Sequence, residues 1–341
     1  MTSLIDTRMP GGDWTTAAVF GSVSTAAVAS SIYIALKSRS VENDVTLCGD
    51  VTKHRYNFRR DDLFSAAWHG DTRQLDVILD RTVLDVNTPN EDGMTPVFFA
   101  AETEQVSAIR YLHDLQAELN IQNKRGHTPL MHAVRNRKIQ SASVLLELGA
   151  DPNITCPSDG CNALVYAVER SDVGIVKLLL SSGARASVVT NSGQSPLTIA
   201  VENNSFDTAH ALSPFLLPSD FNFRLPDGTT PLMLAARSRC DRVTCLLLNF
   251  GARVNARREN GDSALLIACE SGSYDVMTLL LSAGADVNVE NNAGMTCMDQ
   301  VALYPQRSAL RELLQRRGAR PTLSLTSKIY DCVKRLYQLH T

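Results

Sequence analysis

The sequence predicts an all-α fold in which short helix–turn–helix units stack into an elongated solenoid. The stretch 259–292 shows one such unit: a glycine turn, a short apolar segment, a polar break, a longer apolar segment and the closing residues Gly284 to Asn288. A unit of about 33 residues is too short to bury its own apolar face, so neighbouring units must share a core with it. Glycines at the turn position recur every 33 to 35 residues, at Gly93, Gly126, Gly160, Gly193, Gly228, Gly261 and Gly294.

Most of these glycines precede a short motif that suits the start of a helix. Thr or Ser can cap the helix, and Pro at the first helical position lacks an N–H group that would be unpaired there anyway. The motif stands at Thr95-Pro96-Val97, Thr128-Pro129-Leu130, Ser195-Pro196-Leu197 and Thr230-Pro231-Leu232. The period and this Thr-Pro-Leu start resemble the ankyrin repeat, and the matches keep one register along the chain. The resemblance implies a solenoid of about eight units with β-turn tips.

The solenoid is expected to occupy residues 61–321, with atypical units at both ends. The first unit lacks the Gly-Thr-Pro start and the eighth has Cys297 in the Pro position, as suits capping units that meet water on one side. The fifth unit carries Pro214 and Pro218 in its second helix. Because Pro removes a helical hydrogen bond, we expect this helix to stop near Ser213 and the seam beside it to be widened.

Residues 1–37 form a different segment, in which 14–36 contains no charged side chain. Such a run is long enough for a helix that crosses a bilayer. Lys37 and Arg39 follow directly, so the positive-inside rule places the rest of the chain in the cytosol. We expect a membrane anchor at 14–36, which resembles signal anchors of the mitochondrial outer membrane and of the endoplasmic reticulum, and a polar linker at 38–60. The alternatives are a loosely docked arm on a soluble cytoplasmic protein and a cleaved signal peptide.

Residues 322–341 are expected to form a separate amphipathic helix. Leu325, Ile329 and Leu336 lie on one helical face, and burial against the last unit is the usual fate of such a face. The Ser324-Leu325 start also faintly resembles a SOCS box, which would imply recruitment of elongin and a cullin ubiquitin ligase. Ile329 stands where that family carries Cys, so the resemblance is incomplete.

Composition and motifs argue against nucleic-acid binding and catalysis. The formal net charge is −3, which gives no electrostatic reason to expect a polyanion. The pairs Cys156/Cys161 and Cys240/Cys245 lack the Cys-x-x-Cys spacing of zinc sites, so we expect reduced thiols rather than metal ligands or disulfides. The seven histidines are spread along the chain without an H-E-x-x-H motif, and no glycine-rich run resembles a phosphate loop. We therefore expect no enzyme, no cofactor and no metal.

Protein binding is the remaining function, and the resemblance implies where it takes place. In ankyrin arrays the turn tips and the ends of the first helices line up along one concave face. The charges at these positions alternate in sign, which suits an irregular protein surface or an extended peptide. We expect the centre at the basic step formed by Lys124, Arg125, His127, Arg135 and Asn136. The full candidate set adds Glu91, Asp92, Glu169, Arg170, Glu202, Arg237, Glu259 and Glu270.

The sequence thus predicts a non-catalytic scaffold or adaptor that gathers a protein partner at the cytosolic side of a membrane. The alternative is a substrate-recognition adaptor of a cullin ubiquitin ligase that uses the helix at 322–341.

Overall fold

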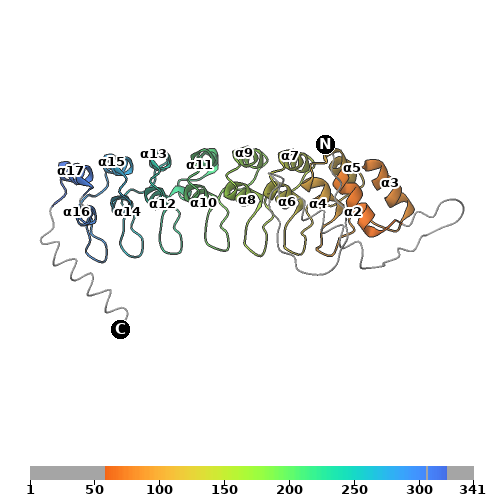
Figure 1. Ribbon diagram of the computed structural model, residues 1–341, viewed down its shortest axis with the longest axis horizontal. Coiled ribbons are helices and arrows are strands. Elements are labelled where there is room, and N and C mark those ends of the chain that lie inside the picture. The colour runs from red at the N-terminus through yellow and green to blue at the C-terminus, as the bar shows by residue number, and fades with distance from the viewer. Residues whose placement is uncertain (1–57, 305, 321–341) are drawn as a thin grey trace, which may run out of the picture.

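The computed structural model describes residues 58–304 and 306–320, and these residues form sixteen α-helices in eight consecutive pairs. Figure 1 shows the pairs in two long rows, with loops that extend from the row of first helices to one side. The first helices are α2 (Arg60–His69), α4 (Pro96–Glu102), α6 (Pro129–Arg135), α8 (Ala163–Glu169), α10 (Pro196–Glu202), α12 (Pro231–Arg237), α14 (Ala264–Ser271) and α16 (Cys297–Ala302). The second helices are α3 (Thr72–Arg81), α5 (Val106–Asp114), α7 (Ile139–Glu147), α9 (Val173–Ser181), α11 (Phe206–Leu212), α13 (Asp241–Asn249), α15 (Tyr274–Ser282) and α17 (Ser308–Arg316). The predicted all-α solenoid is confirmed.

The first helices begin at the predicted caps. Oγ1 of Thr128 accepts a hydrogen bond from the amide of Met131 at 3.2 Å. The fourth unit, which lacks Thr-Pro, uses Asn162 instead: its Oδ1 accepts from the amide of Val165 at 3.0 Å. Among the Thr-Pro and Ser-Pro starts Thr95 is the exception, because its side chain forms no cap hydrogen bond although its backbone position is the same. The missing Thr-Pro of the fourth unit therefore does not change where α8 begins.

The turn tips are tied to one another by backbone hydrogen bonds. The amide of Lys124 donates to the carbonyl of Asp92 at 2.9 Å, and the amide of Asn292 donates to the carbonyl of Asn260 at the same distance. Gly261 has a φ of +83°, and a Cβ atom there would lie 2.7 Å from the backbone nitrogen of Asn292. Glycine is needed at this turn both for its positive φ and for the close approach of the next tip.

A second set of links joins most units on the side of the second helices; the fourth unit, with Ser187 in place of the asparagine, is the exception. Oδ1 of Asn153 accepts from the amide of Arg185 at 2.8 Å, and Oδ1 of Asn255 accepts from the amide of Asp286 at 2.9 Å. These asparagines follow the Gly-Ala pair of their units. The repeated asparagine therefore satisfies a backbone donor of the following unit, which fixes the spacing between units.

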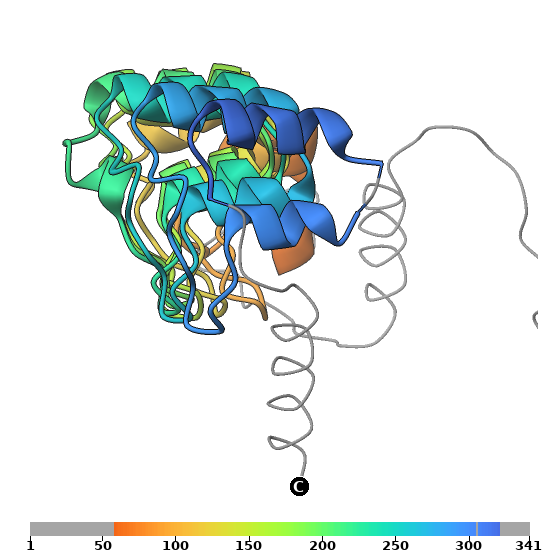
Figure 2. The ribbon, with the colours of Figure 1, turned by 90° about the vertical axis from the view of Figure 1, so that its left-hand side faces the viewer.

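The core lies between the two rows of helices and runs through all eight pairs. Small side chains such as Ala100, Ala101, Ala235 and Ala236 are fully buried on the first helices and allow close helix contacts. Figure 2, turned by 90°, shows the pairs stacked behind one another with their loops on the same side. Each unit thus buries its apolar face against the next, which is the arrangement of a solenoid.

The fifth pair departs from the regular pattern where the two prolines stand. Helix α11 ends at Leu212, close to the predicted stop, and two short 3-10 helices follow, η1 (Ser213–Phe215) and η2 (Asp220–Asn222). We call the segment 213–222, which holds these two 3-10 helices, the insertion. Its Phe221 is 2% exposed, and the ring stacks on Phe250 with 4.8 Å between the centroids. This segment thus places a buried aromatic ring beside the seam, and α12 and α13 continue the two rows beyond it (Figure 1). The widening of the seam stays a prediction.

The array ends in polar surface, as capping units require. The arginines at 311, 316, 317 and 320, on and just after α17, are exposed. No helix within 58–304 and 306–320 combines the length and the apolar character that a bilayer span requires. The predicted membrane anchor at 14–36, most of the linker at 38–60 and the predicted helix at 322–341 lie outside the described residues.

Candidate protein-binding surface

The thirteen candidate residues lie on what we call the inner face, the surface formed by the first helices and the turn tips. Eleven of them are exposed and available to a partner, whereas Arg135 is half-buried and His127 is buried. Within the predicted basic step, Lys124, Arg125 and Asn136 are therefore exposed. Arg135 is partly covered, and His127 lies beneath it.

His127 supports Arg135 rather than presenting its own ring to solvent. Only 7% of His127 is exposed, and Nη1 of Arg135 lies 3.1 Å from both of its ring nitrogens. The guanidinium of Arg135 also lies 5.3 Å from the ring centroid of Tyr166, within the range of a cation–π contact. The prediction that His127 contacts a partner is replaced by a positioning role for the Arg135 side chain.

Below this arginine, His127 belongs to a chain of hydrogen bonds that joins two units. The hydroxyl of Tyr166 donates to Oδ2 of Asp159 at 2.7 Å, so its oxygen is left to accept from Nε2 of His127 at 3.2 Å. The imidazole then carries its proton on Nε2, and its Nδ1 atom accepts from Arg135. The arrangement is consistent only with a neutral His127, since a protonated ring would turn an N–H group toward the guanidinium.

The titration behaviour of these groups agrees with that assignment. Burial, followed by the positive charge of Arg135, lowers the pKa of His127. Burial by itself would raise the pKa of Asp159, but hydrogen bonds from the Cys161 amide and the Tyr166 hydroxyl bring it below its ordinary value. The side chains are thus held as a neutral imidazole and an ionised carboxylate.

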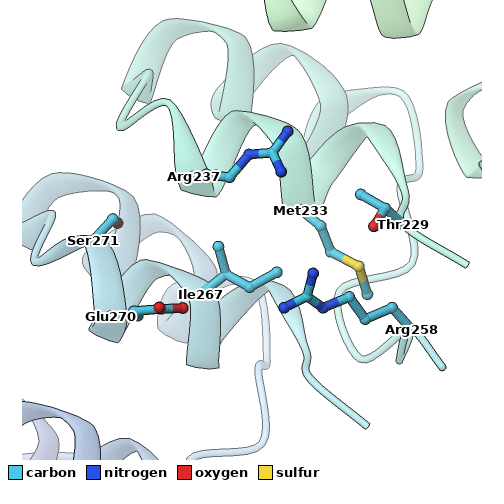
Figure 3. Close-up of a pocket in the computed structure, with 7 residues that line it drawn as sticks. All are labelled: Thr229, Met233, Arg237, Arg258, Ile267, Glu270 and Ser271. Atoms are coloured by element: carbon cyan, nitrogen blue, oxygen red, sulfur yellow. The ribbon is translucent and has the colours of Figure 1, made fainter. Parts of the chain in front are cut away.

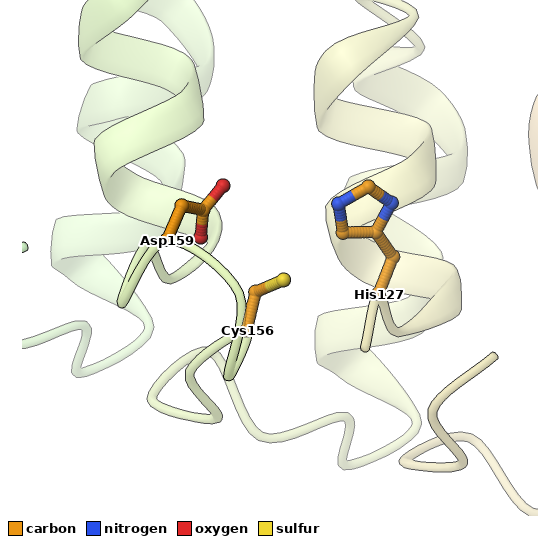
Figure 4. A group of neighbouring side chains, drawn as sticks. All are labelled: His127, Cys156 and Asp159. Atoms are coloured by element: carbon orange, nitrogen blue, oxygen red, sulfur yellow. The ribbon is translucent and has the colours of Figure 1, made fainter. Parts of the chain in front are cut away.

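The same cluster contains donors that could hold a metal ion. Ligand atoms of His127, Cys156 and Asp159 lie within 4.8 Å of one another (Figure 4), and imidazole, thiolate and carboxylate are all zinc ligands. However, Arg135 brings a positive charge to the imidazole, Tyr166 occupies Nε2, and the Cys156 thiol donates to the carbonyl of Arg125 at 3.2 Å. A cation would meet a guanidinium and displace three hydrogen bonds. We therefore assign the cluster to hydrogen bonding between units.

Several charged groups of the inner face pair with the neighbouring unit. Nε2 of His132 lies 3.0 Å from Oε2 of Glu102, and Nη2 of Arg237 lies 3.9 Å from Oε1 of Glu202. Glu202 also accepts a hydrogen bond of 2.7 Å from Gln194. The predicted alternation of charge therefore includes contacts within the array, which the sequence positions alone do not reveal.

Comparison with known proteins identifies the repeat. A family model described as ankyrin repeats in three copies matches residues 63–156, 150–215 and 211–291. The chain belongs to the ankyrin-repeat family. Ankyrin repeats are protein-interaction modules, and this array is a protein-interaction scaffold.

Curated relatives share only part of the array. Neurogenic locus notch homolog protein 2 of Homo sapiens is 37% identical over 94 residues, which is 28% of this ankyrin-repeat chain and 4% of the relative. Neurogenic locus notch homolog protein 1 of Xenopus tropicalis is 37% identical over 100 residues, again 28% and 4%. The matched region is a small fraction of these relatives, so the similarity concerns the repeats.

The inner face also contains functional candidates that sequence reasoning missed. Arg258 precedes the predicted tip residue Glu259, and its Nη2 atom lies 2.5 Å from Oδ2 of Asp262. Tyr166 was not singled out because a hydroxyl 39 residues from its imidazole partner leaves no local pattern. The register of the repeats is the signal that was available: His127 and Tyr166 occupy neighbouring units on the same side of the array.

Proposed function

We propose that this ankyrin-repeat protein is a non-catalytic scaffold whose inner face binds a protein partner, with the basic step around Arg125 and Arg135 at its centre. The observation that carries this proposal is the support beneath Arg135. Its guanidinium is fixed by His127 and Tyr166. A cation held in place before binding loses less conformational freedom when a partner carboxylate pairs with it.

The neighbouring side chains extend the positive surface. Lys124 and Arg125 are exposed at the adjacent turn tip, and Asn136 is exposed directly after α6. This region is flanked by acidic groups, with Glu91 and Asp92 on one side and Glu169 on the other. The surface is therefore complementary to a partner that places carboxylates opposite the step and basic groups beside it.

Partner capture from cells by proximity labelling tests this function. Arg125→Glu combined with Arg135→Gln is expected to weaken capture strongly, because a hot-spot side chain contributes roughly 1–3 kcal/mol. The matched control is Arg73→Glu, which reverses an exposed charge on α3 away from the inner face. Unchanged capture by the double variant, with a normal thermal melt, would refute the placement of the binding centre.

The same proposal places the scaffold at the cytosolic side of a membrane through residues 14–36, in the mitochondrial outer membrane or the endoplasmic reticulum. Support comes from the uncharged run and the basic residues Lys37 and Arg39 that follow it. Carbonate extraction should leave the full chain in the membrane pellet and release a chain that begins at Val41. Release of both chains would favour a soluble cytoplasmic scaffold. Proximity labelling of proteins that reside in one of these membranes would identify the compartment.

A second candidate function rests on Ser324 and Leu325, whose resemblance to a SOCS box implies an adaptor for elongin and a cullin ubiquitin ligase. Co-purification of elongin with the full chain, and its loss in Leu325→Asp, is the expected result for that function. Capture of the inner-face partner without elongin would support the scaffold function and refute the adaptor function.

A further inference from the structure

A pocket of about 230 Å³ opens on the inner face between α12 and α14 (Figure 3). Met233 and Ile267, which are 1% and 6% exposed, form its apolar floor together with Thr229. Arg237 and Glu270, two of the residues predicted for partner binding, lie on its rim with Arg258. An engineered apolar cavity of about 150 Å³ in another protein is large enough to bind benzene, so this volume accepts one aromatic ring.

Arg258 is fixed on one side of the pocket. Its Nε and Nη2 atoms donate to Oδ2 of Asp262 at 3.2 and 2.5 Å. Nδ2 atoms of Asn260 and Asn291 donate to the same carboxylate at 2.7 and 2.8 Å. Burial would raise the pKa of Asp262, but hydrogen bonds from Arg258 and the two asparagines lower it, so the carboxylate stays ionised. The guanidinium is therefore oriented before any ligand arrives.

Arg237 approaches the pocket from α12 and is less constrained. Its side chain is 62% exposed, and its contact with Glu202 is long, at 3.9 Å. Figure 3 shows the guanidinium groups of Arg237 and Arg258 with Met233 and Ile267 between them. Two positive groups beside an apolar floor are complementary to the negative face of an aromatic ring. A thioether in the floor adds a favourable sulfur–ring contact.

We propose that this pocket binds one aromatic side chain of an extended segment of the partner protein. The ring lies on Met233 and Ile267 between the two guanidinium groups, and Glu270 at the rim accepts a hydrogen bond from an indole N–H or a phenol O–H. The inference rests on the proposed partner-binding role of the inner face and adds the chemical class of the anchor residue.

The test uses the full chain with ¹³C-labelled Met and Ile methyl groups and two probes, N-acetyltryptophanamide and N-acetylleucinamide. The tryptophan probe is expected to shift the Met233 and Ile267 methyl signals in a saturable way and to bind roughly two- to fivefold more tightly than the leucine probe. Arg237→Ala should reduce that preference by a similar factor. Arg253→Ala, an exposed arginine in the loop after α13, is the matched control.

Equal binding of both probes, or no shift at Met233 and Ile267, would overturn the inference. Partner capture separates this outcome from failure of the proposed function. If Arg125→Glu with Arg135→Gln abolishes capture while Arg237→Ala leaves it intact, the proposed scaffold function is supported and the proposed aromatic anchor is refuted. If all these variants capture the partner normally, the inner face itself is not the binding surface.

Discussion

The hydroxyl of Tyr166 donates a hydrogen bond of 2.7 Å to Oδ2 of Asp159. The bond closes a chain that begins at Arg135, passes through His127 and ends at a carboxylate of the next turn tip. A residue predicted to meet a partner directly therefore acts one layer below the surface. The positive charge above it owes its position to the His127 and Tyr166 rings, which are both buried.

Tyr166→Phe is expected to lower the free energy of unfolding by about 1–3 kcal/mol, because removal of the hydroxyl takes the donor from Oδ2 of Asp159 and the acceptor from Nε2 of the buried His127. Tyr111→Phe is the matched control, since the Tyr111 hydroxyl also bonds a carboxylate, that of Asp76 at 2.7 Å, but on an exposed surface. That variant should change stability by no more than about 0.5 kcal/mol. Urea denaturation measures both values, and equal losses would contradict the role given to burial.

A second prediction concerns pH. Burial and the charge of Arg135 lower the pKa of His127 in the folded protein, so the unfolded chain takes up the proton at a higher pH than the folded chain does. The stabilisation that the neutral His127 gives the folded state is therefore complete above about pH 6.5. It is lost as the pH falls toward the lower pKa of His127 in the folded protein. Thermal melts between pH 7.5 and pH 5 should show a smaller loss in His127→Gln than in the wild type. The same slope in both proteins would rule out a neutral buried imidazole.

Much of the fold follows from the sequence because its causes are local and repeated. The turn glycines, the Thr-Pro starts and the small alanines each act within one unit or between identical positions of neighbours. Even the substituted start at Asn162 keeps its helix, since an amide oxygen caps as a hydroxyl does. The place where α11 stops was predictable because Pro214 cannot continue a helix.

The remaining features depend on side chains that meet only after the units have stacked. The chain from Arg135 to Asp159 joins residues of two units, and the burial of Phe221 depends on its contact with Phe250 of the next unit. Sequence positions also give no orientation, which is why His127 was expected on the surface. Exposure of tip residues such as Lys124 and Arg125 could be predicted, whereas the pairing of Arg258 with the buried Asp262 could not.

Two threonines in the same position of their units provide a third prediction. Thr95 is fully buried, and its Oγ1 atom has no hydrogen-bond partner among the residues that the structure describes. Oγ1 of Thr128 caps α6. Thr95→Val should be neutral or stabilising by up to about 1 kcal/mol, because it removes an unpaired polar atom at constant shape. Thr128→Val should lose about 1 kcal/mol with its cap, and the difference between the two urea midpoints is the measurement. A loss in Thr95→Val as large as that in Thr128→Val would show that both hydroxyls cap their helices.

The last prediction concerns the insertion in the fifth unit, which presents one buried and one exposed phenylalanine. Phe221 is 2% exposed and stacks on Phe250, so Phe221→Ala should destabilise the array by about 3–5 kcal/mol. Phe215, which is 53% exposed, is the matched control and should change stability by no more than about 0.5 kcal/mol when it becomes Ala.

Hydrogen exchange along the chain distinguishes local destabilisation around Phe221 from a general loss of stability. Because each unit of a solenoid contacts only its neighbours, amides of α11 and α13 should exchange faster in Phe221→Ala while those of α4 and α5 keep their protection. Uniform acceleration along the chain would instead mean that the array unfolds as one cooperative block. In that case the insertion is as much part of the common core as the regular units, and its two prolines mark no boundary in stability.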